Sequence, residues 1–154
     1  MSYLVCSGAP ESWRNSREGY LRLADWFNQV GEACRQHGLR FGYHNHAREF
    51  DRVDGTVGVD LLMEHTDPAL VLAELDVFWV EQVGFRATDY VKKYAGRCDL
   101  IHIKDMTADD RETFAEVGYG RFDIPDLVAT AVQWLLVEQD VCERDSMDSV
   151  TRSY

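Results

Sequence analysis

Apolar residues occur along the chain in two patterns, as short continuous runs and as runs with helical spacing. Short continuous apolar runs bounded by polar residues are typical of strands that are buried on both faces of a sheet. We therefore expect strands over residues 3–7, 39–44, 69–80, 99–106 and 134–140.

Between these runs, apolar residues recur at steps of three and four, which is typical of amphipathic helices. The clearest case precedes Gly38 and has apolar side chains at Tyr20, Leu23, Phe27, Val30 and Cys34. Further helices are expected over 57–65, 87–95 and 124–132, the last with Pro125 near its first turn. Because strands and helices alternate throughout, we expect a parallel sheet covered by helices.

Composition narrows the class of protein. With 154 residues and no linker or low-complexity segment, the chain is expected to form one domain over residues 1–154. The formal net charge of −11 repels phosphate backbones and anionic lipids, so neither nucleic acid nor a membrane surface is an expected partner. The four cysteines are widely spaced, and no apolar run is long enough to span a bilayer. We therefore expect a cytoplasmic protein with reduced thiols.

Parallel α/β proteins bind ligands at the carboxyl ends of their strands, and here these ends are polar. The residues concerned are His44, His46 and Glu49 after the second strand, Glu74 and Asp76 in the third, His102, Lys104 and Asp105 in the fourth, and Glu138 and Asp140 in the fifth. Glu49, Asp76, His102 and Glu138 follow one another at intervals of 27, 26 and 36 residues, about one βα unit each time. Adjacent parallel strands would bring these four side chains together.

Carboxylates on a buried strand face indicate a bound cation. Glu74 and Asp76 share one face by the two-residue period of a strand, and burying two carboxylates is costly unless a cation neutralises them. Together, Glu49, Asp76, His102 and Glu138 would form an oxygen-rich site suited to Mn²⁺, Mg²⁺ or Co²⁺. Glu74 or His46 is an alternative to Glu49, which lies several residues past its strand.

Such a site favours proton-transfer chemistry on a small sugar, sugar phosphate or polyol. A divalent ion can hold two neighbouring oxygens of the substrate and stabilise the charge that develops when an adjacent C–H proton leaves. If Glu49 and Glu138 each bind the metal through one oxygen, their other oxygens would serve as general base and general acid. Paired glutamates of this kind predict epimerisation or aldose–ketose isomerisation.

Five segments carry a family resemblance, namely GLRFGYHNHAREFD, LAELDVFWV, LIHIKDM, EVGYGRFDIPDL and WLLVEQD. In this order and spacing they resemble the sugar phosphate isomerase/epimerase family of xylose isomerase-like TIM barrels. The resemblance implies a divalent metal, with Mn²⁺ as the first choice, held at Glu49, Asp76, His102 and Glu138. It also implies that His44 and Lys104 face the substrate and that Gly118–Asp123 lies over the mouth of the site. Trp79 is a candidate stacking surface for the sugar.

The chain supplies about five strands, whereas a closed (β/α)8 barrel has eight. By the resemblance, 3–7 corresponds to the third strand of the barrel and 134–140 to the seventh. The expected fold class is therefore α/β, a partial (β/α)8 TIM barrel that lacks the first two βα units and the last strand. Such an open sheet exposes two edges and its inner face. We expect either a fragment or an intimate homodimer that covers these surfaces, and we favour the homodimer.

Several alternatives stay open at this point. An inosose-type dehydratase would use the same metal and glutamates, and a non-catalytic binding or assembly module would retain the site without turnover. An endonuclease of abasic DNA is disfavoured because the chain shows no basic groove. Single residues also have plainer interpretations: His44 as a structural histidine, Glu74 as a residue that orients a ligand, Lys104 and Asp105 as an ion pair, Asp140 as a turn cap, and Trp79 as part of the core.

Overall fold

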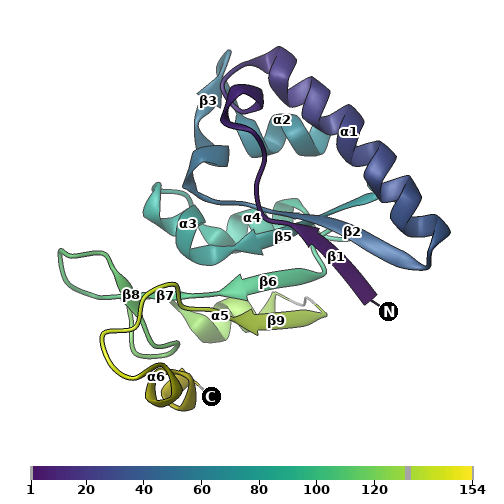
Figure 1. Cartoon of the computed structure of the whole chain (residues 1–154). Helices are drawn as coiled ribbons and strands as arrows, with labels where there is room; N and C mark the ends of the chain where they lie inside the picture. The colour runs from purple at the N-terminus through teal and green to yellow at the C-terminus, as the bar shows by residue number, and fades with distance from the viewer. Residues whose placement is uncertain (1, 131–132, 154) are drawn as a thin grey trace.

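A five-stranded parallel sheet forms the centre of the computed structural model, which describes residues 2–130 and 133–153. Its strands are β1 (Ser2–Cys6), β2 (Leu39–His44), β5 (Val71–Asp76), β6 (Leu100–Ile103) and β9 (Trp134–Val137). They lie side by side in this order and all run parallel. Figure 1 shows the sheet curling from β1 to β9, with helices packed against it. The predicted partial barrel is confirmed.

Helices and short elements connect these strands. The α-helices are α1 (Arg17–Gln36), α2 (Gly58–Glu64), α3 (Val77–Gln82), α4 (Ala87–Lys93), α5 (Ile124–Ala129) and α6 (Ser146–Ser153). The short elements are the 3₁₀ helices η1 (Glu11–Trp13) and η2 (Ala47–Phe50), and the antiparallel pairs β3 (Arg52–Val53) with β4 (Thr56–Val57) and β7 (Asp105–Met106) with β8 (Phe114–Ala115). The last two residues of the helix predicted over 124–132 lie outside the described residues. In the described ranges, none of the helices combines the length and the apolar character needed to cross a membrane.

The apolar spacing of α1 builds the largest part of the core. The helix begins where the Ser16 hydroxyl accepts a hydrogen bond from the backbone of Gly19 at 3.1 Å, a normal N-cap. It ends before Gly38, whose φ of +72° is in the left-handed region that favours glycine. Its buried apolar side chains, Tyr20, Leu23, Ala24, Phe27 and Cys34, face β2 and α2. The spacing of apolar residues thus predicted both the helix and its packed face.

The third strand is shorter than its apolar run predicts. A strand is expected over 69–80, but β5 ends at Asp76 and α3 begins at the next residue. Asp76 Oδ1 accepts hydrogen bonds from the backbone of Phe78 at 3.0 Å and of Trp79 at 3.4 Å, so the carboxylate caps the helix. Buried helices and buried strands have equally continuous apolar runs, and periodicity therefore does not separate them.

Asp105 attaches a loop to the end of the fourth strand. The predicted strand over 99–106 is interrupted at Lys104, which separates β6 from β7. The buried Asp105 carboxylate accepts hydrogen bonds from the backbone N–H groups of Met106, Gly118, Gly120 and Phe122. Asp105 therefore holds the Gly118–Asp123 segment instead of pairing with Lys104. The position of that segment over the mouth of the site stays a prediction.

The outer strands of the sheet expose apolar surface, as expected for an open barrel. All four residues of β9 are exposed, with Trp134 at 56%, Leu135 at 40%, Leu136 at 39% and Val137 at 47%. At the opposite edge, Leu4 of β1 is 49% exposed. Each of these strands has a single neighbour within the described part of the sheet.

Candidate metal centre

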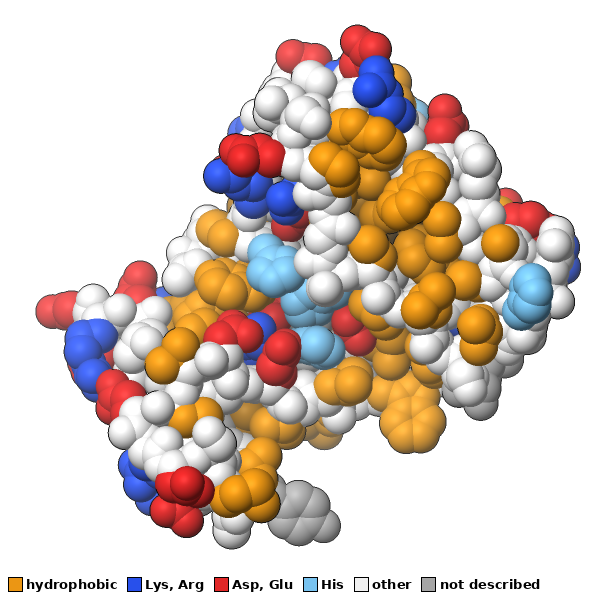
Figure 2. Space-filling view, viewed as in Figure 1, with side chains coloured by type: hydrophobic (Ala, Val, Ile, Leu, Met, Phe, Trp, Pro, Cys, Tyr) orange, Lys and Arg blue, Asp and Glu red, His pale blue; other side chains and the backbone are white. Residues whose placement is uncertain are grey.

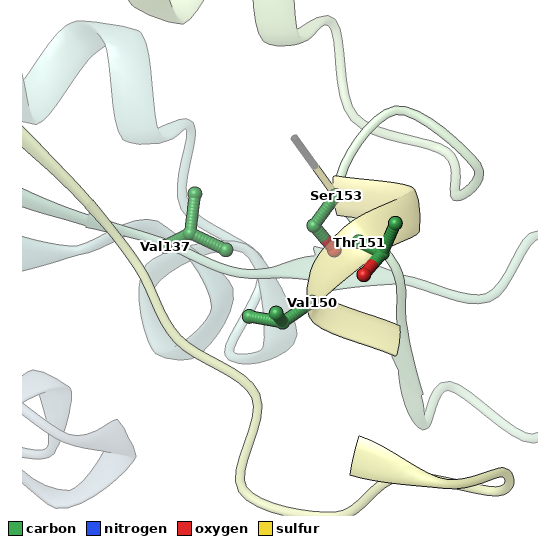
Figure 3. Close-up of a pocket in the computed structure, with 4 residues that line it drawn as sticks. All are labelled: Val137, Val150, Thr151 and Ser153. Carbon is green, nitrogen blue, oxygen red and sulfur yellow. The ribbon is translucent and has the colours of Figure 1, made fainter. Parts of the chain in front are cut away.

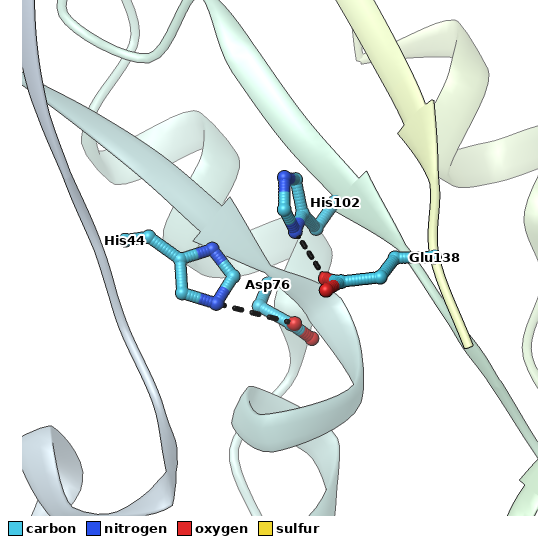
Figure 4. A group of neighbouring side chains, drawn as sticks. All are labelled: His44, Asp76, His102 and Glu138. Atoms are coloured by element: carbon cyan, nitrogen blue, oxygen red, sulfur yellow. Dashed lines mark hydrogen bonds and ion pairs between the residues drawn. The ribbon is translucent and has the colours of Figure 1, made fainter. Parts of the chain in front are cut away.

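Four side chains converge at the carboxyl ends of four neighbouring strands. His44 is the last residue of β2 and Asp76 the last of β5, while His102 lies in β6 and Glu138 follows β9. Each offers one ligand atom, and these atoms all lie within 4.8 Å of one another. Figure 4 shows the side chains pointing toward one another, and in Figure 2 histidine, acidic and basic side chains gather in the middle of the face shown. The structure thus brings together Asp76, His102 and Glu138, as predicted, with His44 as a fourth member.

Asn45 attaches the end of β2 to the end of β5. Its side-chain oxygen accepts a hydrogen bond from the Asp76 N–H at 3.1 Å, and its amide group donates to the Asp76 carbonyl at 3.4 Å. The carboxylate of Asp76 lies next to the preceding histidine, with 3.6 Å between Asp76 Oδ2 and His44 Nε2. The HNH segment, residues 44–46, therefore contributes His44 as a candidate ligand and Asn45, which holds the backbone of Asp76 in place.

Glu74 contacts both imidazoles of the cluster. Its carboxylate oxygens lie 3.3 Å from His44 Nδ1 and 3.4 Å from His102 Nε2. The other nitrogens face the cluster, with His102 Nδ1 2.5 Å from Glu138 Oε2. A carboxylate behind an imidazole fixes the orientation of the ring and the nitrogen that remains available to a metal. The geometry therefore agrees with the interpretation of Glu74 as a residue that orients ligands.

The charges of the cluster are unevenly compensated. Burial alone would raise the pKa of Glu74, but His102 and His44 more than offset this effect and lower the pKa to about 2. For Asp76, burial prevails over the nearby Lys104 ammonium and raises the pKa above its ordinary value. Burial would lower the pKa of His102, yet the Glu74 and Glu138 carboxylates raise it. Of the three carboxylates of Glu74, Asp76 and Glu138, that of Asp76 is the one whose pKa is raised.

Lys104 is buried among carboxylates. Its side chain is 2% exposed, and Nζ lies 2.9 Å from Asp76 Oδ2, 3.1 Å from Glu138 Oε2 and 3.0 Å from Asp140 Oδ2. Although burial would lower its pKa, these carboxylates raise the pKa of Lys104 above its ordinary value. Asp140 is therefore an ion-pair partner of Lys104 instead of a turn cap. The predicted contact of Lys104 with a substrate stays a prediction.

Glu49, predicted as a metal ligand and general base, lies outside the cluster. It is fully buried in η2, beyond the end of β2. Its Oε1 accepts hydrogen bonds from Arg14 Nη1 at 2.6 Å and from the Tyr43 hydroxyl at 2.8 Å, and its Oε2 accepts one from the His46 backbone at 2.8 Å. Both oxygens therefore bind protein groups, and the structure corrects the prediction for Glu49.

His44 takes the position that the sequence interpretation assigned to Glu49. Counting acidic residues at βα intervals favoured Glu49, although it follows its strand by several residues. The useful signal is the last residue of the apolar run, because His44 ends β2 as Asp76 ends β5. Trp79 lies near the cluster on α3, with its ring 5.5 Å from Lys104 Nζ and 5.7 Å from the His46 ring. Its stacking on a sugar stays a prediction.

The donor set of the cluster fits a divalent cation. Asp76 Oδ2, which faces His44 Nε2, is buried and has no hydrogen bond of normal geometry to the described residues, although Lys104 Nζ lies 2.9 Å from it. The Lys104 ammonium contacts three carboxylates, those of Asp76, Glu138 and Asp140, while the Glu74 carboxylate contacts the His44 and His102 imidazoles. A further positive charge would reduce this excess of negative charge. Imidazole nitrogens and carboxylate oxygens are ligands that first-row divalent ions accept, so the cluster could hold a metal ion.

The chain is similar in sequence to inosose dehydratases, and no family model matches it. It is 30% identical over 105 residues to the inosose dehydratase of Clostridium beijerinckii. This match covers 68% of this chain and 34% of that protein. It is 27% identical over 139 residues to the inosose dehydratase of Geobacillus kaustophilus. This match covers 77% of this chain and 44% of that protein. The chain thus spans less than half the length of these curated relatives.

Solved structures show the same architecture. A sugar phosphate isomerase/epimerase from Parabacteroides distasonis superposes with a TM-score of 0.84 at 25% identity, over 99% of this chain and 55% of that chain. A probable 3-DHS dehydratase from Bacillus anthracis superposes with a TM-score of 0.73 at 10% identity, a likeness in fold alone. The chain is therefore a partial xylose isomerase-like TIM barrel, of the superfamily that includes the sugar phosphate isomerase/epimerase proteins and the inosose dehydratases.

Proposed function

We propose that this chain carries the metal centre of an isomerase or epimerase that moves a proton on a small sugar, sugar phosphate or polyol. The observation behind this proposal is the convergence of the four cluster residues at the carboxyl ends of parallel strands. Barrels of this architecture place their active sites at that end. The names of the relatives, isomerase/epimerase and dehydratase, describe reactions compatible with removal of a proton beside a carbonyl group.

A divalent ion in this site would polarise the substrate oxygens and make the neighbouring C–H proton easier to remove. His44, Asp76, His102 and Glu138 would hold the ion. With His44 in place of Glu49, the donors are two nitrogens and two oxygens, a set that favours a transition metal over Mg²⁺. We propose Mn²⁺, with Co²⁺ as the alternative.

Two side chains at the cluster are suited to carry protons. Glu138 uses Oε2 for its contacts with His102 and Lys104, and Oε1 has no hydrogen bond to the described residues. The His46 ring lies 4.8 Å from the His44 ring, and burial together with His44 lowers the pKa of His46. An imidazole with a lowered pKa is neutral at pH 7 and keeps a nitrogen lone pair free, which a general base requires. We therefore assign His46, in place of Glu49, and Glu138 as the two proton-transfer residues. Burial would raise the pKa of Glu138, but Lys104 and His102 lower it, so Glu138 starts the reaction as the carboxylate.

Substitution of Glu138 tests this assignment. Glu138→Gln should lower turnover by roughly 10²- to 10⁴-fold, because the amide can neither donate nor accept the transferred proton as a carboxyl group does. The fold should persist, since the Glu138 side chain is 40% exposed. The measurement is deuterium incorporation from heavy water into candidate ketoses with Mn²⁺ present, and Glu143→Gln at an exposed ion pair is the control. Full exchange in Glu138→Gln would contradict the proposed role.

An inosose-type dehydratase is the second candidate, favoured by the names of the curated relatives. It would use the same proton removal and would then expel a hydroxyl group as water. Mass spectrometry of the products separates the two reactions, because dehydration removes the mass of one water and isomerisation removes none. A metal-loaded protein that shows neither reaction nor deuterium exchange would favour the non-catalytic binding module.

We also propose that a second copy of the chain covers the open edge at β9. The four exposed residues of β9 and the preceding Gln133 are uncharged, although the whole chain has a formal net charge of −11. Next to this edge, Val137 and three residues of α6, namely Val150, Thr151 and Ser153, line a groove of about 330 Å³ (Figure 3). An uncharged apolar edge lets two acidic copies meet by pairing the same surface of each.

Leu136→Lys should convert the dimer to a monomer, because edge-to-edge pairing would bury the new ammonium without a partner. Size-exclusion chromatography with light scattering should give about twice 17.7 kDa for the unmodified chain and about 17.7 kDa for the variant. Val128→Lys, at an exposed position of α5, is the matched control and should leave the dimer intact. An unmodified chain that is monomeric at all concentrations would refute this assembly.

A further inference from the structure

Lys104 contacts the same carboxylate oxygens that face the two imidazoles of the candidate metal centre. Asp76 Oδ2 lies 3.6 Å from His44 Nε2 and 2.9 Å from Lys104 Nζ. Glu138 Oε2 lies 2.5 Å from His102 Nδ1 and 3.1 Å from Lys104 Nζ. One ammonium group therefore bridges the two oxygens that are best placed to bind a metal ion.

Lys104 has a further set of partners away from the four cluster residues. Its ammonium donates a hydrogen bond to Asp140 Oδ2 at 3.0 Å, and Asp140 does not belong to the cluster. The rings of Trp79 and Phe114 lie 5.5 Å and 5.9 Å from Nζ, distances at which an aromatic face stabilises a cation. The ammonium would remain compensated if it lost its contacts with Asp76 and Glu138.

We propose that Lys104 is a built-in cation that holds the site together without metal, and that it withdraws to Asp140 when Asp76 and Glu138 bind a divalent ion. This inference rests on the metal centre proposed above. Two cations that share one carboxylate oxygen repel each other strongly in a buried site. The flexible four-carbon stem of lysine lets the ammonium move without a change in the backbone. Without Lys104, the metal-free protein would bury the Asp76 carboxylate beside other carboxylates at a large cost.

Two substitutions that should change the affinity for Mn²⁺ in opposite directions test this exchange. Lys104→Met removes the competing cation and should tighten Mn²⁺ binding by about tenfold or more. Asp140→Asn removes the second partner of the ammonium and should weaken Mn²⁺ binding, because Lys104 then stays on Asp76 and Glu138. In the Lys104→Met background, Asp140→Asn should have no further effect. Calorimetric titration of the full chain with Mn²⁺ measures all four proteins.

The double variant separates exchange from a simple change of net charge. If Asp140 acted only through its own negative charge, Asp140→Asn would weaken Mn²⁺ binding equally with and without Lys104. Equal weakening in both backgrounds would overturn the proposal. Thermal melting gives a second readout: Lys104→Met should melt earlier than the unmodified chain without metal, and Mn²⁺ should raise its melting temperature by more. If Lys104→Met does not fold without metal, Lys104→Gln serves in the same cycle with the same expected signs.

The outcomes also separate this inference from the metal centre on which it rests. If the unmodified chain does not bind Mn²⁺, both proposals fail together. If the chain binds Mn²⁺ and loses binding on His102→Ala, the metal centre stands. In that case, unchanged or weaker Mn²⁺ binding by Lys104→Met would overturn the exchange alone.

Discussion

Replacing Asp76 with Asn should weaken Mn²⁺ binding by about 10²-fold or more and leave the fold intact. Asp76 Oδ2 faces His44, whereas Oδ1 caps α3 through the backbone of Phe78 and Trp79. An asparagine side chain keeps an oxygen for the helix cap but loses the negative charge. Loss of an outer partner of a metal ligand typically costs 10- to 100-fold in metal affinity, so loss of a ligand itself should cost on the order of 10²-fold or more.

Calorimetric titration with Mn²⁺ measures this loss, and thermal melting shows whether the variant is folded. Asp89→Asn is the matched control, because Asp89 is an exposed aspartate in the first turn of α4. The control should bind Mn²⁺ as the unmodified chain does. An Asp76→Asn protein with unchanged Mn²⁺ affinity would remove the physical basis of the proposed function.

Replacing Glu49 with Gln has its largest effect on stability, in contrast to Asp76. Glu49 is fully buried and pairs with the Arg14 guanidinium at 2.6 Å. Removing one partner of a buried ion pair leaves the other charge uncompensated, which costs roughly 3–5 kcal/mol of the free energy of unfolding. In addition, a glutamine amide in place of Oε2 would direct N–H groups at the N–H of His46, which now donates to that oxygen.

Urea unfolding measures the stability of Glu49→Gln, and calorimetric titration measures its Mn²⁺ affinity, which should stay close to that of the unmodified chain. Glu32→Gln, at an exposed ion pair with Arg35 on α1, should show no measurable loss of stability. The double variant Arg14→Met with Glu49→Leu should recover much of the stability, because no unpaired charge is left. Lost Mn²⁺ affinity with unchanged stability would instead return Glu49 to the role of a metal ligand.

The sequence predicted those residues of the site that lie at or next to the carboxyl ends of the strands. Asp76, His102 and Glu138 come together because parallel neighbours place their carboxyl ends at one edge of the sheet. Glu49, which the sequence analysis assigned as a metal ligand, lies outside the cluster because its carboxylate binds a residue far away in the sequence. Arg14, before α1, supplies a cation to Glu49, and no local pattern links these two positions.

The order of strands and helices and the polar character of the strand ends were determined by the sequence itself. These features are local, because a strand or a helix shows its own period in neighbouring residues. The tertiary structure decided which polar side chains meet and which charges neutralise one another. Asp76 ends β5 by capping α3, Glu49 turns to Arg14, and Lys104 reaches Asp140, each through a partner that only the folded chain brings within contact distance. Electrostatic pairing depends on distance in space, which the curl and register of the sheet determine.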